Sequence, residues 1–193
     1  TLSGVDQTQV RTSTMSSSNA YADWSVMYKT VNQANLILKH VPEMGISESV
    51  RNFSLGNAYF SRAWCYFWIA RIWGDAPLAL TGYESTAGDL YLPRAPKAEI
   101  FARIESDLTE AERYVTDNSD KAVATPAAVQ MLKADYALWM YRVAGGGSSY
   151  LTMAEKAIEA GDCPAEAVPE LKPVFKNLNA WYPGVDKTNV GVG

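Results

Sequence analysis

The segment from Ser47 to Gly74 limits the possible folds of this chain more than any other part of the sequence. Its apolar residues recur at helical spacing, and its aromatic residues crowd more than one face of the predicted helix. Arg62 and Arg71 interrupt the apolar run, which is therefore too short to cross a bilayer. A helix that is apolar on all sides needs neighbours around it. We predict that this helix forms the centre of the core.

Four other segments show the same helical period, so the sequence predicts an all-α fold with about five main helices and long loops. The predicted helices span residues 24–41, 47–74, 96–115, 125–143 and 149–161. Ser47 and Thr125 are typical N-caps, and prolines mark the starts of the third and fourth helices. The spacing in the last two helices is similar to that of a tetratricopeptide hairpin, although Gly145, Gly146 and Gly147 interrupt it.

The regions outside the helices divide the chain into three parts. Residues 1–18 are rich in Ser and Thr without apolar periodicity, which favours an extended or poorly ordered lead-in to a helical domain over residues 19–162. Residues 163–193 contain four prolines, so we expect an irregular tail. Within the domain, residues 75–95 show no period and form a long connection, and connections of that length commonly carry function.

Composition argues against several classes of function. A net charge of -4 provides no positively charged surface for nucleic acid or an anionic membrane. Cys65 and Cys163 are too few for a disulfide framework, and the single histidine, His40, has no partners at metal-ligand spacing, so neither a metal nor a cofactor is expected. The opening residues lack both an apolar stretch and a lipidation cysteine, so any targeting segment is expected to have been removed.

The charged residues within the helices have structural interpretations, and no catalytic group emerges from them. Arg62 lies in the most apolar helix and is expected to pair with a carboxylate or with helix-end carbonyls. Asp107 and Glu110 are interpreted as part of the solvated side of an amphipathic helix. Asp75 is expected to form a turn after Gly74. Cys65, among aromatic residues, is expected to be an inert buried thiol, and the protein is predicted not to be an enzyme.

Four aromatic residues are predicted to belong to the core because they lie in the apolar segment of the second predicted helix or on the buried stripe of the fourth. They are Trp64, Phe67, Trp68 and Trp139.

Polar and aromatic residues meet where the lead-in enters the first helix, at Asn19, Tyr21, Asp23 and Trp24. A sugar presents apolar C–H faces and a rim of hydroxyl groups, so its site needs an aromatic platform beside hydrogen-bonding groups. Tyr21 is the better platform, because Trp24 belongs to the apolar stripe of the helix. The rival location is the long connection, with Tyr83 and Tyr91.

Four segments in order resemble the motifs of one protein family, the SusD/RagB nutrient-binding lipoproteins. They are Trp24-x3-Tyr28-x2-Val31 with Ala34-Asn35, Arg62-Ala63-x2-Tyr66-Phe67 with Trp73-Gly74-Asp75-Ala76-Pro77-Leu78, Arg94 with Glu99-Ile100-Phe101-x2-Ile104-x2-Asp107-Leu108-x2-Ala111, and Thr125 with Ala127-Ala128 and Leu132-Lys133-Ala134-x-Tyr136, followed by Ala154, Ala157 and Gly161. The second segment is the most specific match. Together the segments cover roughly residues 21 to 162.

The resemblance implies a tetratricopeptide-like scaffold in a lipoprotein on the outward face of the outer membrane, held by a lipid anchor that this chain does not contain. It also implies capture of a glycan or other nutrient for a TonB-dependent, SusC-like transporter. Family members are usually much longer, so part of their binding surface lies in sequence that this chain lacks. A helical adaptor that binds only proteins, in the grooves between stacked helices, is the alternative hypothesis.

Overall fold

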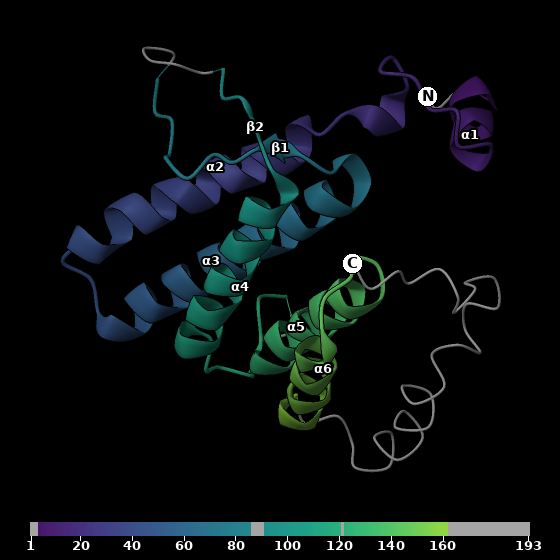
Figure 1. Cartoon of the computed structure of the whole chain (residues 1–193). Coiled ribbons are helices and arrows are strands. Elements are labelled where there is room, and N and C mark those ends of the chain that lie inside the picture. Colours follow the sequence, from purple (N-terminus) through teal and green to yellow (C-terminus); the bar gives the residue numbers. More distant parts are fainter. Residues whose placement is uncertain (1–3, 86–90, 121, 162–193) are drawn as a thin grey trace. The chain divides into compact units, whose positions relative to one another are not determined.

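The computed structural model describes residues 4–85, 91–120 and 122–161, and over these ranges the chain is mostly helical (Figure 1). The α-helices are α1 (Gly4–Arg11), α2 (Ser25–His40), α3 (Glu48–Trp73), α4 (Lys97–Tyr114), α5 (Pro126–Arg142) and α6 (Ser148–Ala160). The strands β1 (Ala76–Pro77) and β2 (Arg94–Ala95) pair antiparallel. The predicted all-α class is confirmed. The expected irregular tail, with Cys163, lies outside the described residues.

The chain forms two compact units, residues 1–129 and residues 130–193. In the first unit, α3 packs against both α2 and α4, so that three long helices lie side by side (Figure 1). In the second unit, Ala134 of α5 packs with Ala157 and Ile158 of α6. Neighbouring helices thus form successive hairpins within each unit, as the sequence period predicts.

The ends of α3 lie where the sequence predicts them. The hydroxyl of Ser47 accepts a hydrogen bond from the backbone N–H of Val50, which is otherwise without a partner in the first turn. Gly74 ends the helix with a φ of 70°, a conformation that costs glycine little. The N–H of Gly74 donates to the carbonyl of Ala70, so the last turn is closed.

Helix α3 is also the centre of the core of the first unit. Tyr66, Phe67 and Ile69 on α3 are fully buried, as are Ile100 and Ile104 on α4. This burial explains why the helix has apolar residues on more than one face, because α2 and α4 cover different sides of it.

The lead-in differs from the extended segment that the sequence predicts. Residues 4–11 form α1, and residues 20–22 form a short 3-10 helix, η1 (Ala20–Ala22). The hydroxyls of Thr8 and Thr12 donate to backbone carbonyls four residues earlier, so these side chains bond along the helix instead of competing with it. Helix α1 buries no residue, which is why apolar periodicity did not reveal it.

The predicted aromatic core is correct for Phe67, which is fully buried, and wrong for Trp64, which is 40% exposed. Trp68 and Trp139 are partly buried. Trp64 lies two residues after Arg62, about 200° around the helix axis, so its side chain leaves from the side opposite the buried guanidinium. Its ring packs beside Trp68, with 6.0 Å between the centroids.

A buried ion pair joins α3 to α4. The Nε and Nη2 atoms of Arg62 each donate to a carboxylate oxygen of Asp107 at 2.8 Å, and Nη1 donates to Oδ1 of Asn35 on α2 at 2.7 Å. Arg62 is 4% exposed and Asp107 is 0% exposed. The expectation that Arg62 finds a carboxylate is therefore confirmed. The interpretation of Asp107 as a solvated residue is wrong, because the guanidinium holds its carboxylate inside the core.

We expect Arg62→Ala to lower the free energy of unfolding by about 3 kcal/mol, since the buried carboxylate of Asp107 would lose both hydrogen bonds from Arg62 and keep only the ion pair with Arg103 at 3.3 Å. Urea denaturation followed by circular dichroism measures this loss. The double variant Arg62→Met with Asp107→Leu should recover much of it, because both charges leave together.

The control is Arg113→Ala, which removes an exposed arginine that pairs with Glu110 at 3.6 Å on the same helix. Its cost should be about 0–1 kcal/mol. Equal losses for Arg62→Ala and Arg113→Ala would show that the buried pair does not stabilise the fold.

A second prediction separates the two aromatic residues of α3. Phe67→Ala should cost about 3–5 kcal/mol of unfolding free energy, because it leaves a cavity in a closed core. Trp64→Ala should cost clearly less, since much of the indole is already in water. Thermal unfolding of the two variants gives the comparison, and a larger loss for Trp64→Ala would contradict the burial pattern.

Candidate functional site

A cleft of about 550 Å³ lies between the start of α2 and the connection that joins α3 to α4. The residues that line it are Asp23, Trp24, Ser25, Tyr28, Asn32, Pro77, Ala79, Tyr83, Tyr91 and Leu92. All of them belong to the first compact unit. Helix α2 supplies one wall, and the two arms of the connection supply the other.

Side chains of α2 hold the connection in place by bonding to its backbone. The hydroxyl of Tyr28 donates to the carbonyl of Pro77 at 2.7 Å. Asn32 makes two bonds to Tyr83, since its amide NH₂ donates to the carbonyl at 3.1 Å and its oxygen accepts from the N–H at 2.7 Å. The side-chain amide of Asn32 thus bonds to both backbone groups of Tyr83, as a neighbouring strand would, and this holds Tyr83 at the cleft.

A third contact links this wall to the core. The amide of Asn35 donates to the carbonyl of Ala79 at 2.9 Å, and the hydroxyl of Tyr66 donates to the same carbonyl at 2.7 Å. Asn35 also accepts from Arg62, so the wall of the cleft is bonded to the buried ion pair. The cleft therefore has a rigid inner side.

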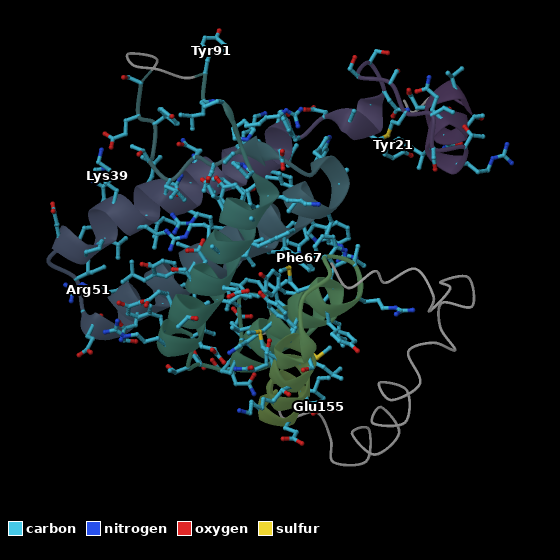
Figure 2. The ribbon with its side chains drawn as sticks, in the orientation of Figure 1. Tyr21, Lys39, Arg51, Phe67, Tyr91 and Glu155 are labelled. Atoms are coloured by element: carbon cyan, nitrogen blue, oxygen red, sulfur yellow. The ribbon has the colours of Figure 1, made fainter. Side chains whose placement is uncertain are left out.

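Aromatic rings form much of the cleft surface. The ring of Trp24 contacts those of Tyr28 and Trp73, with centroid distances of 5.5 Å and 5.8 Å. The guanidinium carbon of Arg94 lies 5.0 Å from the centroid of Trp24. Tyr91 is 91% exposed and projects from the outer part of the connection (Figure 2). Such rings offer flat surfaces to the apolar faces of a ligand.

Asp23 supplies the negative charge of the cleft. Its carboxylate accepts hydrogen bonds from the N–H and the hydroxyl of Ser25, at 2.8 Å and 3.0 Å. The bond from the backbone N–H is the main cause that lowers the pKa of Asp23 below its ordinary value. Burial raises the pKa of Tyr28 to about 12. At neutral pH the carboxylate is therefore ionised and Tyr28 is neutral.

The structure brings together three of the residues that the sequence singled out for ligand contact. Asp23, Trp24 and Tyr83 line the cleft, and so does Tyr91. The start of the first helix and the long connection, which the sequence treats as rival locations, are two walls of one cleft. That these residues contact a ligand stays a prediction.

Two other candidates lie away from the cleft lining. Asn19 is buried and caps η1, because its Oδ1 accepts from the N–H of Tyr21 and its amide donates to the carbonyl of Asp6. Tyr21 is 43% exposed. Asn19 therefore has a structural explanation, whereas Tyr21 has an exposed ring that does not border this cleft.

Sequence reasoning missed Ser25 and Asn32 as cleft residues, and it treated Tyr28 only as part of a motif. Trp24, Tyr28 and Asn32 follow one another at intervals of four, so they form one stripe on α2. That spacing was the available signal. The spacing alone does not indicate a cleft, because aromatic residues at helical spacing are ordinarily assigned to the core.

The predicted turn motif closes the base of the connection. Asp75 accepts a hydrogen bond from the N–H of Lys97 at 2.8 Å through its carboxylate, and its carbonyl accepts from Arg94. Pro77 lies opposite Arg94 in the strand pairing. Gly74, Asp75, Pro77 and Arg94 thus bring both ends of the connection together, which agrees with the expected turn role of Asp75.

Other chemistry-bearing groups lie outside the cleft. Cys65 is buried, and burial raises the pKa of its thiol to about 11, as expected for an inert cysteine. His40 and Lys39 contact Glu84 at 2.7 Å on the surface. Within the described ranges, no cluster of three or more His, Cys, Asp and Glu residues could hold a metal ion. Of the helices that the structure describes, none is long and apolar enough to span a membrane.

Comparison with known proteins identifies relatives of this chain. Residues 3–139 match the sequence model of a SusD-like family described as starch-binding and associating with the outer membrane. SusD-like protein P38 of Formosa agariphila is 33% identical over 103 residues, which are 53% of this chain and 20% of that protein.

Solved structures of related proteins share the fold. A SusD superfamily protein from Bacteroides vulgatus is 31% identical, with a TM-score of 0.64 over 72% of this chain and 29% of that one. A crystal structure with a xylogluco-oligosaccharide has a TM-score of 0.73 at 24% identity, over 84% of this chain and 33% of the other. That likeness concerns the fold alone. The chain spans a third or less of the length of each of these proteins.

We predict that Asn32→Leu loosens the wall of the cleft that carries Tyr83. The substitution removes both bonds to Tyr83, so the backbone amide of Tyr83 should exchange with solvent faster, and stability should fall by about 1–3 kcal/mol. Hydrogen exchange read residue by residue measures the effect. Gln33→Leu, at the adjacent exposed position of α2, is the control and should leave Tyr83 protected. Unchanged exchange at Tyr83 in Asn32→Leu would contradict this account of the wall.

Proposed function

This chain belongs to the SusD-like family of starch-binding proteins that associate with the outer membrane, and we propose that it captures an oligosaccharide or other nutrient for uptake. In this proposal the full-length protein is a lipoprotein on the outward face of the outer membrane. It passes its ligand to a TonB-dependent, SusC-like transporter. Its role is binding and delivery, without chemical conversion of the ligand.

The cleft is the observation that carries the proposal. Trp24, Tyr83 and Tyr91 offer rings to the C–H faces of sugars, while Asp23 and Asn32 offer groups that accept or donate hydrogen bonds to hydroxyls. A sugar ring needs both kinds of group at once. The inner wall is held by bonds to α2, so little further ordering is needed when a ligand binds.

The fold shared with a protein solved with a xylogluco-oligosaccharide suggests a first ligand to test. The family description suggests a second, a starch fragment such as maltohexaose. Trp24 lines the cleft, so its fluorescence should respond when either sugar binds. A titration of the chain with each oligosaccharide, followed by tryptophan emission and by calorimetry, is the direct experiment.

A protein-binding adaptor is the second candidate function, and one surface feature favours it. An apolar groove of about 380 Å³ lies between α2 and α3, lined by Val26, Met27, Thr30, Phe60, Ser61, Trp64 and Cys65. Val26 is largely exposed, and so is much of Trp64. Exposed apolar grooves between helices commonly receive protein segments. Under this alternative, no oligosaccharide changes the tryptophan emission.

We predict that Tyr91→Ala weakens oligosaccharide binding about threefold to tenfold, because one stacking surface is lost. Tyr91 is so exposed that its removal should leave the melting temperature unchanged. Calorimetric titration with the oligosaccharide that binds the wild-type chain measures the affinity.

Tyr21→Ala is the matched control, since it removes an exposed tyrosine that does not line the cleft. It should bind like the wild-type chain. If Tyr91→Ala also retained full affinity, the ligand would bind elsewhere and the proposed site would be wrong.

A further inference from the structure

The cleft has an uneven distribution of charge. Among the described residues that line it, Asp23 alone is ionised at neutral pH. The other polar groups are the hydroxyl of Ser25, the amide of Asn32 and the phenols of the tyrosines. Each of these can bond to a neutral hydroxyl, and none offers a positive charge to an anion.

Asp23 also occupies the position where an anionic ligand would bind best. The free N–H groups at the start of a helix attract negative charge, and α2 begins at this cleft. Asp23 accepts from the N–H of Ser25 at 2.8 Å, so the protein's own carboxylate fills that position. An acidic sugar would meet a fixed negative charge where it needs donors.

Two cationic side chains lie near the cleft without lining it. Lys29 contributes to the electrostatic environment of Asp23 from the exposed side of α2. Arg94 lies over the ring of Trp24 and donates to the carbonyl of Asp75. Of these three charged groups, Asp23 alone is among the described residues that line the cleft, so its carboxylate is the charge that a ligand in the cleft would contact directly.

We propose that the cleft selects neutral oligosaccharides over glycans that carry carboxylate or sulfate groups, and that Asp23 is the residue that sets this preference. The inference rests on the proposed function, because it concerns the ligand of the same cleft. The carboxylate accepts hydrogen bonds from hydroxyls of a neutral sugar and repels an anionic one. The discrimination lies in a single side chain on a fixed backbone.

The experiment compares each neutral sugar with its own acidic form. Maltohexaose and a xylogluco-oligosaccharide are titrated against the chain before and after oxidation of their primary hydroxyls to carboxylates. We expect the acidic forms to bind about tenfold more weakly at low salt, and the difference to shrink as ionic strength rises. Asp23→Asn keeps an oxygen for Ser25 and should reduce the difference to about twofold, mostly by improving the acidic form.

Two further variants make the result specific. Glu43→Gln removes the same charge from an exposed position in the short 3-10 helix that follows α2 (Val41–Glu43) and should leave the tenfold difference intact. Lys29→Gln removes an exposed cation that does not line the cleft, so it should not reduce the difference. Equal or tighter binding of the acidic forms by the wild-type chain, or an undiminished difference in Asp23→Asn, would overturn the charge selection while oligosaccharide binding itself stands. Absence of binding by every sugar would instead overturn the proposed function, and this inference with it.

Discussion

The guanidinium of Arg62 is the group on which the rest of the first unit depends. It lies inside the most apolar helix, where its donors have no access to water and must find acceptors in the protein. Asp107 on α4 and Asn35 on α2 provide them. Because a planar guanidinium bonds only in fixed directions, this arrangement sets the positions of both neighbouring helices relative to α3.

The same network extends to the surface. Asn35 accepts from Arg62 with its oxygen and donates to the carbonyl of Ala79 with its nitrogen. One side chain thus joins the core to the segment between α3 and α4. That carbonyl also accepts from Tyr66 on α3. The inner wall of the cleft is thus bonded to two helices at one point. A long segment with little strand structure can hold a defined shape here because side chains satisfy its backbone groups.

Local patterns were enough to predict helices α2 to α6, because capping residues and apolar periodicity act over a few positions. Ser47 and Gly74 mark the two ends of α3 as expected. The need of Arg62 for a carboxylate also follows from local sequence, but the choice of Asp107 does not, since 45 residues separate the two. On its own helix Asp107 is indistinguishable from a solvated acid. Helix α1 shows the opposite case, a polar helix with no apolar stripe to reveal it.

The cleft shows the same difference between patterns within a short stretch of sequence and hydrogen bonds between residues far apart in the sequence. The sequence identified both of its aromatic walls, but it could not show that they meet, because the bonds from Tyr28 and Asn32 reach about fifty residues along the chain. Those bonds also hold the part of the cleft near Tyr83 more firmly than the part near Tyr91. Tyr83 is fixed at its backbone by Asn32, whereas Tyr91 stands almost fully in solvent on the outer arm. In the proposed function, the ligand would bind to an inner surface that is already ordered, which lowers the entropic cost of binding.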